Sequence, residues 1–222
     1  IIVKDNFYND PNSIRKIFLN SIHNKNESDY LHFADYTGSF HEIPGTSKKN
    51  ENLDYEYTTS PFFMNEHKVY FESILHSEVV NIYDSGYFCL NTCLKGNPKI
   101  TIHNFDKNEK YEEWYAILFL TPDATPKDGV VFYKNKKYDI RSVFELNDTT
   151  KIVKNEIVND MIKCSPDLTE WTMESFISNR FNRIVIFKKD LFFSEGMFFG
   201  SNVNDSRLTQ HFTFTTIKND IK

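Results

Sequence analysis

The sequence predicts a mainly β protein with flanking α-helices, arranged as a double-sheet barrel or jelly roll. Two helix patterns lie in the first third of the chain, and short segments rich in aromatic and β-branched residues follow, divided by turn signals. Helices first and then a run of short strands are typical of two packed sheets with helices outside.

The chain opens with a short strand and then a helix, in "VKDNFYNDPNSIRKIFLNSI". Asp10 is the predicted N-cap and Pro11 the first helical residue. Apolar residues at helical spacing share one face, so we expect this helix to pack on a core. These residues are Ile14, Ile17, Phe18 and Ile22.

A second helix is predicted in "TSPFFMNEHKVYFESIL", with Ser60 as its cap and Pro61 as its first residue. The segment between the two helices, residues 35–57, is polar and rich in turn residues, which favours a loop or lid. A third helix is predicted over residues 148–162, ending before Pro166.

At least six strands are predicted after the second helix. They span residues 87–95, 99–105, 114–120, 129–135, 183–188 and 211–217. The length of 222 residues suits one well-cored domain, supplied by 21 Phe and 12 Tyr. We therefore expect a single domain over residues 1–222, in which residues 1–80 pack on a barrel core of residues 87–218.

The charge pattern argues against a nucleic-acid partner. The formal net charge is −5 and is spread along the chain, so no basic footprint is seen. No apolar run approaches the roughly 20 residues that span a bilayer, and the opening residues lack the order of a signal peptide. We expect a cytoplasmic protein without membrane contact; its substrate and oligomeric state are not indicated.

The cysteines do not suggest a disulfide framework, because there are only 3 of them. Cys89 and Cys93 share a strand face, and without nearby partners this pair favours apolar packing over zinc binding.

The C-terminal strand carries a candidate anion site. Arg207 and Thr209 alternate with Leu208, so their side chains share one face. If that face lines the barrel, the planar guanidinium fork suits a small dicarboxylate. The alternative is a rim arginine paired with a nearby Asp or Glu.

Four stretches in this order and spacing carry a family resemblance: "DNFYNDPNSIRKIFL", "YTGSFHEIPGTS", "WYAILFLTPDATPKDGVVFYKNK" and "NRIVIFKKDLFFSEGMFFG…DSRLTQHFTF". Together they make the chain resemble the Fe(II)/2-oxoglutarate-dependent dioxygenases, in a prolyl-hydroxylase-like branch. The resemblance implies a cupin-like jelly roll, the double-stranded β-helix, with Fe(II) and 2-oxoglutarate as cofactors. It also implies an iron site of two histidines and one carboxylate, and an Arg-x-Ser/Thr pair for the far carboxylate of 2-oxoglutarate.

Only one of the three iron ligands that the resemblance implies is present at its expected position. His103 matches the first histidine, but Phe105 stands at the carboxylate position two residues later. Phe193 stands where relatives have the distal histidine. Because phenyl rings cannot coordinate iron, the implied iron site is degraded.

The implied co-substrate clamp is retained, since Arg207 and Thr209 match its two positions. Tyr133 lies on a strand predicted to face the pocket, where it either contacts a bound ligand or packs in the core. By the geometry of the family, the loop over residues 36–57 borders the pocket mouth.

Substitute metal ligands are conceivable. A bulge after His103 would turn Asp106 inward, and Glu195 shares the face of Phe193 in a regular strand. His103, Asp106 and Glu195 would then offer one imidazole and two carboxylates. Alternatively Asp106 begins a solvated loop and Glu195 pairs locally, which we favour. His211 shares the strand face of Arg207, at the depth of the co-substrate floor or beyond.

Three functions follow. The first is an oxidoreductase, an oxygenase that binds iron through substitute ligands. The second is a pseudoenzyme of the same fold, which binds a carboxylate or a protein partner without metal. The third is a structural jelly-roll module in which Arg207 only forms a salt bridge. The phenylalanines at 105 and 193 favour the second over the first, and the retained clamp argues against the third.

Overall fold

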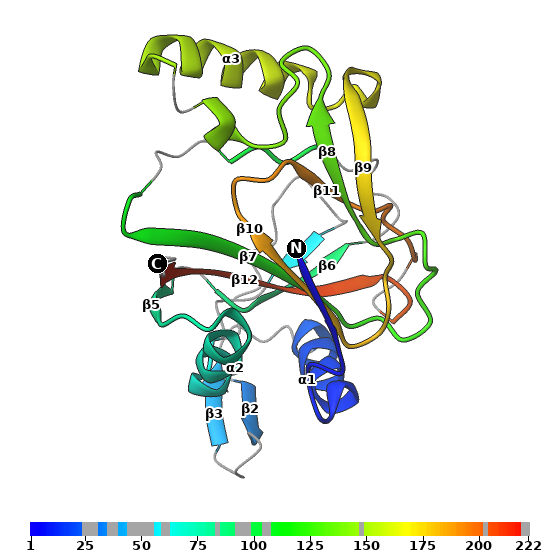
Figure 1. The fold of residues 1–222 in the computed structure, drawn as a ribbon. Coiled ribbons are helices and arrows are strands. Elements are labelled where there is room, and N and C mark those ends of the chain that lie inside the picture. Colours follow the sequence, from blue (N-terminus) through cyan, green and yellow to red (C-terminus); the bar gives the residue numbers. More distant parts are fainter. Residues whose placement is uncertain are drawn as a thin grey trace.

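The computed structural model describes most of the chain (Figure 1). The described residues are 1–23, 31–34, 40–43, 56–58, 63–82, 85–91, 99–103, 108–146, 149–201 and 204–218. The helices are α1 (Pro11–His23), α2 (Asn65–Leu75) and α3 (Lys151–Cys164), with short 3₁₀ turns at Val143–Leu146 and Leu168–Glu170.

The strands of the described residues pair antiparallel throughout. In chain order they are β1 (Ile2–Asp5), β2 (Leu31–Ala34), β3 (Phe40–Ile43), β4 (Glu56–Thr58), β5 (Val79–Ile82), β6 (Tyr87–Asn91), β7 (Tyr111–Phe119), β8 (Val130–Asn135), β9 (Trp171–Ile177), β10 (Arg183–Lys188), β11 (Phe193–Glu195) and β12 (Arg207–Ile217).

Two of the sheets face each other. The large sheet has the order β1-β10-β7-β12-β6-β4, with β5 also paired to β12, and the small sheet has the order β11-β8-β9. Between them lies an aromatic cluster to which both sheets contribute, Tyr115 and Phe187 from the large one and Phe132 and Phe193 from the small one. The protein is therefore mainly β with flanking helices, of the double-stranded β-helix or jelly-roll kind, as predicted.

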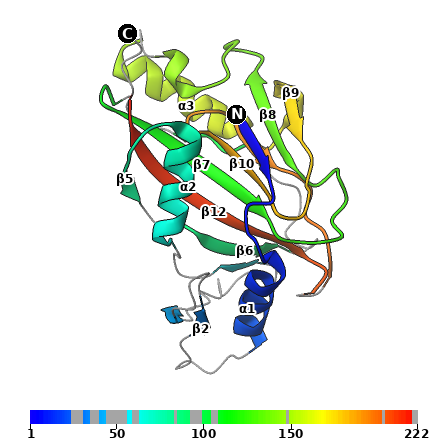
Figure 2. The same ribbon diagram turned by 60° about the horizontal axis from the view of Figure 1, so that its bottom comes forward.

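Helices cover both outer faces of this pair of sheets (Figures 1 and 2). Phe18 of α1, Phe71 of α2 and Phe212 of β12 belong to a second cluster. Val158 of α3 packs with Tyr133 of β8 in a third cluster, on the far side of the small sheet. The layers thus run α1 and α2, large sheet, small sheet, α3, and the interior between the sheets is separate from the two helix-covered cores.

The first helix forms as predicted. The carboxylate of Asp10 accepts a hydrogen bond from the backbone N–H of Ser13, 3.1 Å away, which caps the helix that Pro11 begins. The second helix begins later than predicted, at Asn65, and Ser60 and Pro61 lie outside the described residues. Here the cap is a side chain from within the first turn: Nδ1 of His67 accepts from the N–H of Met64 at 3.1 Å.

Four of the six predicted strands correspond closely to β7, β8, β10 and β12, and β6 forms from the first half of a fifth. Residues 99–103 of the strand predicted over residues 99–105 form no strand, because Thr101 makes only an isolated bridge with Phe193, and residues 104–105 lie outside the described residues. The predicted loop over residues 35–57 contains β3 and β4, and its other residues lie outside the described part. The third helix is α3, which begins and ends slightly later than predicted.

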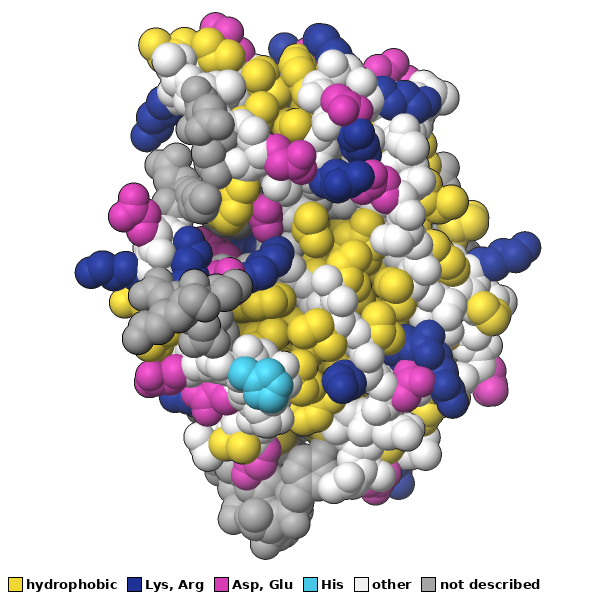
Figure 3. All heavy atoms as spheres, viewed as in Figure 1, with side chains coloured by type: hydrophobic (Ala, Val, Ile, Leu, Met, Phe, Trp, Pro, Cys, Tyr) yellow, Lys and Arg dark blue, Asp and Glu magenta, His cyan; other side chains and the backbone are white. Residues whose placement is uncertain are grey.

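The face shown in Figure 3 carries acidic and basic side chains interspersed around a hydrophobic centre, so no basic stripe is seen there. Within the described ranges no helix has the length and apolar character needed to cross a membrane.

Candidate functional site

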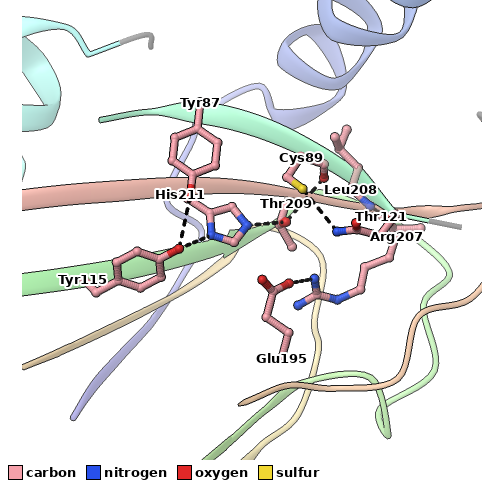
Figure 4. A network of polar contacts seen from close by, with 10 residues as sticks. Tyr87, Cys89, Tyr115, Thr121, Glu195, Arg207, Leu208, Thr209 and His211 are labelled. Carbon is pink, nitrogen blue, oxygen red and sulfur yellow. Dashed lines mark hydrogen bonds and ion pairs between the residues drawn. The ribbon is translucent and has the colours of Figure 1, made fainter. Parts of the chain in front are cut away.

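The candidate site lies on the interior face of β12. Arg207 and His211 contact residues of the aromatic interior, whereas Leu208 and Phe212 belong to the cluster under α1 and α2. Thr209 lies between Arg207 and His211 on the same face (Figure 4). The predicted alternation of Arg207, Leu208 and Thr209 is therefore confirmed.

The backbone at Arg207 is held on both sides by one hydroxyl. Thr121 donates from its hydroxyl to the carbonyl of Ser206 at 3.0 Å, and accepts from the N–H of Leu208 at 2.8 Å. Both neighbours of Arg207 are thus tied to the chain just after β7. This fixes where the guanidinium enters the interior.

Arg207 is completely buried and only partly paired. Its side chain is 0% exposed, and Nη1 forms an ion pair with Oε2 of Glu195 (Figure 4). Nε and Nη2 have no hydrogen-bond partner in the part of the chain that the structure describes. The rings of Phe119 and Phe198 lie 5.7 Å and 5.9 Å from Cζ, so the guanidinium is bordered by aromatic rings.

The two unpaired nitrogens form one edge of the guanidinium plane. Nε–H and one N–H of Nη2 point in parallel from that edge, the arrangement that receives the two oxygens of a carboxylate. Burying a cation without saturating its donors is costly. Among the described residues the two unpaired donors of Arg207 therefore lack a hydrogen-bond acceptor, which a ligand could supply.

Glu195 comes from the small sheet. It is the last residue of β11 and shares its face with Phe193, as predicted for a regular strand. The residue between them, Ser194, points the other way, with its hydroxyl 3.2 Å from that of Tyr133. The carboxylate that we considered as a substitute metal ligand is thus engaged by Arg207, which is the local pairing that we favoured.

A directed chain of hydrogen bonds surrounds His211 (Figure 4). The hydroxyls of Tyr87 and Tyr115 are 3.2 Å apart, that of Tyr115 is 2.7 Å from Nδ1 of His211, and Nε2 of His211 is 2.7 Å from the hydroxyl of Thr209. Thr209 donates to the carbonyl of Cys89 at 3.4 Å. Since Thr209 donates there, it accepts from Nε2–H, and Nδ1 accepts from Tyr115.

These hydrogen bonds restrict what Thr209 and His211 can bind. The hydroxyl proton of Thr209 is directed at a backbone carbonyl, so Thr209 must release Cys89 before it can donate to a carboxylate beside Arg207. His211 uses both ring nitrogens in hydrogen bonds to hydroxyls. Metal binding through His211 would require one of these bonds to break.

His103 lies beside Phe193, as the resemblance implied for the two iron-ligand positions. Its ring centroid is 6.1 Å from that of Phe193 and 5.9 Å from that of Tyr115. Burial, and secondarily the charge of Lys189, lower the pKa of His103 to about 4, so its imidazole is neutral at neutral pH. Its Nε2 is buried and has no partner among the described residues.

The described residues do not fit an iron site. Among them no group of three or more His, Cys, Asp or Glu side chains is placed to hold a metal ion. Phe105 and Asp106 lie outside the described residues, so the substitute set His103, Asp106 and Glu195 stays a prediction. The unpaired edge of Arg207 offers two parallel donors, which match the two oxygens of a carboxylate.

Tyr133 faces away from this interior, which corrects the strand face predicted for it. Phe132 pairs with Phe193 and belongs to the interior cluster, whereas Tyr133 belongs to the cluster under α3. Val131 packs on the same cluster as Tyr133, as regular alternation along β8 requires. Tyr133 therefore packs in the core and does not approach Arg207.

Sequence reasoning missed Tyr115, which contacts His103, Phe193 and His211. Burial, together with the neighbouring Tyr87 and Glu195, raises the pKa of Tyr115 well above its ordinary value, so it stays a neutral hydroxyl that can donate. A signal was available: Tyr115 has the same parity as Ile117 and Phe119 in the alternation of β7, the face turned to the interior.

Comparisons with known proteins found no matching family model and no matching curated protein. Solved structures with a similar chain trace include a prolyl hydroxylase from Trichoplax adhaerens in complex with a hypoxia inducible factor peptide fragment. Its TM-score is 0.43 at 9% identity, over 96% of this chain and 82% of that chain.

Two Streptomyces proteins are similar to the same degree. HygX from Streptomyces hygroscopicus, with nickel, 2-oxoglutarate and hygromycin B bound, has a TM-score of 0.43 at 12% identity, over 96% of this chain and 81% of that chain. AviO1 from Streptomyces viridochromogenes has a TM-score of 0.41 at 12% identity, over 97% and 88%. At such scores these structures carry no statement about activity, which is argued below from this chain's own residues.

Proposed function

We propose that this protein binds a small carboxylate at Arg207, on an oxygenase-like fold, without iron-dependent oxidation. One observation carries the proposal: a fully buried guanidinium whose Nε and Nη2 have no partner in the described chain. A buried donor pair in this geometry is what a carboxylate ligand satisfies. In this proposal Arg207 alone serves as the carboxylate clamp that the dioxygenase resemblance implied.

A purely structural role for Arg207 accounts for less. The ion pair with Glu195 uses Nη1 alone. A guanidinium selected only to hold two strands together gains nothing from leaving its other edge buried and unpaired, because each orphaned donor costs about 1–3 kcal/mol. The unpaired edge therefore favours a ligand-binding role for Arg207 over a purely structural one.

The absence of a metal role rests on the donor set. His103 offers one neutral imidazole next to the phenyl ring of Phe193, and Glu195 is engaged by Arg207. One imidazole without two further ligands does not usually retain Fe(II). The oxidoreductase chemistry of the resembled family would need a ligand set that the described residues do not supply.

The test is calorimetry without metal, using 2-oxoglutarate, pyruvate, L-glutamate and L-alanine as probes. Saturable binding of at least one probe is expected in the unaltered protein. It should be abolished in Arg207→Met and weakened at least tenfold in Arg207→Lys, which keeps the charge and loses the fork. Arg141→Lys is the matched control, since Arg141 forms an exposed pair with Glu174 at 2.7 Å. Heats that are equal in all four proteins would contradict the proposal.

A second candidate is an iron oxygenase, favoured by the unpaired Nε2 of His103. Anaerobic titration with Fe(II) and 2-oxoglutarate tests it, through the weak visible charge-transfer band of the chelate. A band that disappears in both His103→Gln and Asp106→Asn would establish this candidate and overturn the metal-free one. We expect no band.

A further inference from the structure

Glu195 is the more exposed partner of the buried Arg207. The side chain of Arg207 has no exposure, whereas that of Glu195 is 21% exposed. The two are joined in an ion pair from β12 to β11, across the space between the sheets (Figure 4). A ligand on the unpaired edge of the guanidinium therefore lies close to a carboxylate that is partly open to solvent.

The backbone that carries Glu195 is tightly packed. The N–H of Gly196 donates to the carbonyl of Gly129 at 2.5 Å, in a close approach of two chain segments. A Cβ atom at Gly196 would lie 2.6 Å from the backbone N of Gly129 and 2.6 Å from the carbonyl carbon of Asp128. This close packing fixes the backbone next to Glu195, which keeps its carboxylate within reach of Arg207.

A ligand carboxylate on Arg207 then shares the site with a second negative charge. In a partly buried setting two like charges a few ångströms apart repel strongly, and this repulsion is a means of selecting ligands. A ligand with a cationic group next to its carboxylate avoids the penalty, because the cation faces Glu195 while the carboxylate faces the guanidinium. A carboxylate has acceptor sites for several donors, so Glu195 can contact Arg207 and a ligand ammonium together.

The geometry points to Glu195 as the residue that sets specificity, so that the Arg207 site takes α-amino acids in preference to the corresponding 2-oxo acids. This inference rests on the proposed function and names the class of its ligand. The α-carboxylate binds the free Nε and Nη2 edge of Arg207, and the α-ammonium binds the carboxylate of Glu195. No covalent step is involved.

Matched ligand pairs test the inference in the metal-free protein. L-Glutamate and 2-oxoglutarate differ only at C2, where an ammonium-bearing carbon replaces a carbonyl, and L-alanine and pyruvate differ in the same way. By calorimetry we expect the amino acid of each pair to bind at least tenfold tighter. In Glu195→Gln the 2-oxo acids should gain at least tenfold and the amino acids should lose affinity. Glu174→Gln, in the exposed pair with Arg141, is the matched control and should change neither.

The outcomes separate this inference from the proposed function. Arg207-dependent binding in which the 2-oxo acid is as tight as its amino acid, or tighter, overturns the role of Glu195 and leaves the carboxylate site standing. Absence of binding by all four probes overturns both. If Glu195→Gln does not fold, the ligand pairs still decide in the unaltered protein, and Glu195→Asp, which keeps the charge, should keep the preference.

Discussion

Strand β12 carries a buried polar network on each of its two faces, and the networks differ in how completely their polar atoms are paired. On the helix-covered face, Gln210 belongs to a network with Tyr8 and His67. On the interior face, Arg207 and His211 belong to the network of the candidate site. Both networks are buried and lie on one strand, so they can be compared directly.

The helix-side network is saturated. The hydroxyl of Tyr8 donates to Gln210 at 2.7 Å and is 2.9 Å from Nε2 of His67. The amide of Gln210 donates to the carbonyl of Gly86 at 2.9 Å, and Nδ1 of His67 accepts from Met64. Each side-chain polar atom of these three residues has a partner, which is what a network that only joins elements requires.

The interior network is saturated around His211 and open at Arg207. Both ring nitrogens of His211 form hydrogen bonds. In contrast, Nε and Nη2 of Arg207 and Nε2 of His103 have no partner among the described residues. The comparison teaches that burial of polar groups does not by itself indicate function. Two adjacent buried donors of one cation that both lack a partner in the described chain are a stronger indication, because no hydrogen bond among these residues offsets the free energy of their desolvation.

Breaking the saturated network should have the largest effect on stability. Tyr8→Phe removes one hydroxyl and, with it, the hydrogen bonds to the carbonyl oxygen of Gln210 and to Nε2–H of His67. At roughly 1–3 kcal/mol for each of these buried hydrogen bonds, we expect a loss of about 3 kcal/mol in the free energy of unfolding, measured in urea. Tyr70→Phe is the control: Tyr70 packs on the same cluster, and its hydroxyl has no hydrogen bond to a described residue. A loss below about 1 kcal/mol in Tyr8→Phe would contradict this account.

The pH dependence of stability sharpens the comparison next. Burial lowers the pKa of His67 to about 3, and its Nδ1 already accepts from Met64, which leaves no place for a second ring proton. With an unfolded pKa near 6.5, the unfolded chain protonates first as the pH falls. The contribution of His67 is therefore complete above about pH 6.5 and is lost toward pH 3.

His67 alone makes the free energy of unfolding fall by roughly 1.4 kcal/mol for each pH unit between pH 6 and pH 4. In His67→Gln, urea unfolding at several pH values in that window should show a free energy of unfolding that depends less steeply on pH, by about this amount per pH unit. His103, with a pKa near 4, adds to the slope of both proteins and does not affect the difference. Equal slopes would show that His67 is protonated in the folded protein.

Closing the open network should change stability least, and in the opposite direction. Arg207→Met combined with Glu195→Leu removes the ion pair together with the unpaired donors. Apolar replacement of a buried ion pair is often neutral or stabilising, so we expect the free energy of unfolding to rise by about 1 kcal/mol while carboxylate binding is lost. A matched single variant, Arg207→Met, should be less stable than the double one. A double variant destabilised by more than about 2 kcal/mol would indicate that the pair serves structure.

Local patterns predicted the fold well where a local cause dominates. Asp10 and Pro11 define the start of α1 without tertiary help, and period-two alternation predicted the interior face shared by Arg207 and Thr209. The start of α2 was mispredicted because its cap is the side chain of His67, which no N-cap preference reveals. β11 has only three residues, too few for a periodic signal.

The site was harder to predict because its contacts join distant parts of the chain. The partner of Arg207 follows from the facing of β11 and β12, which lie in different sheets. Tyr115 reaches His211 only because β7 and β12 pair in one particular register. Tyr133 was assigned to the wrong face because alternation along β8 is regular but does not say which of its two faces turns to the interior. Each of these depends on strand order, register or packing, which residue patterns do not contain.

Side-chain NMR of Arg207 tests the central claim most directly. The Nε–H resonance of Arg207, assigned by its disappearance in Arg207→Lys, reports on the free edge of the guanidinium. On titration with L-glutamate in metal-free buffer, this resonance should shift downfield and saturate, while the other arginine Nε–H resonances stay in place. An Arg207 resonance that does not move with any of the four carboxylate probes would contradict a carboxylate site at this residue.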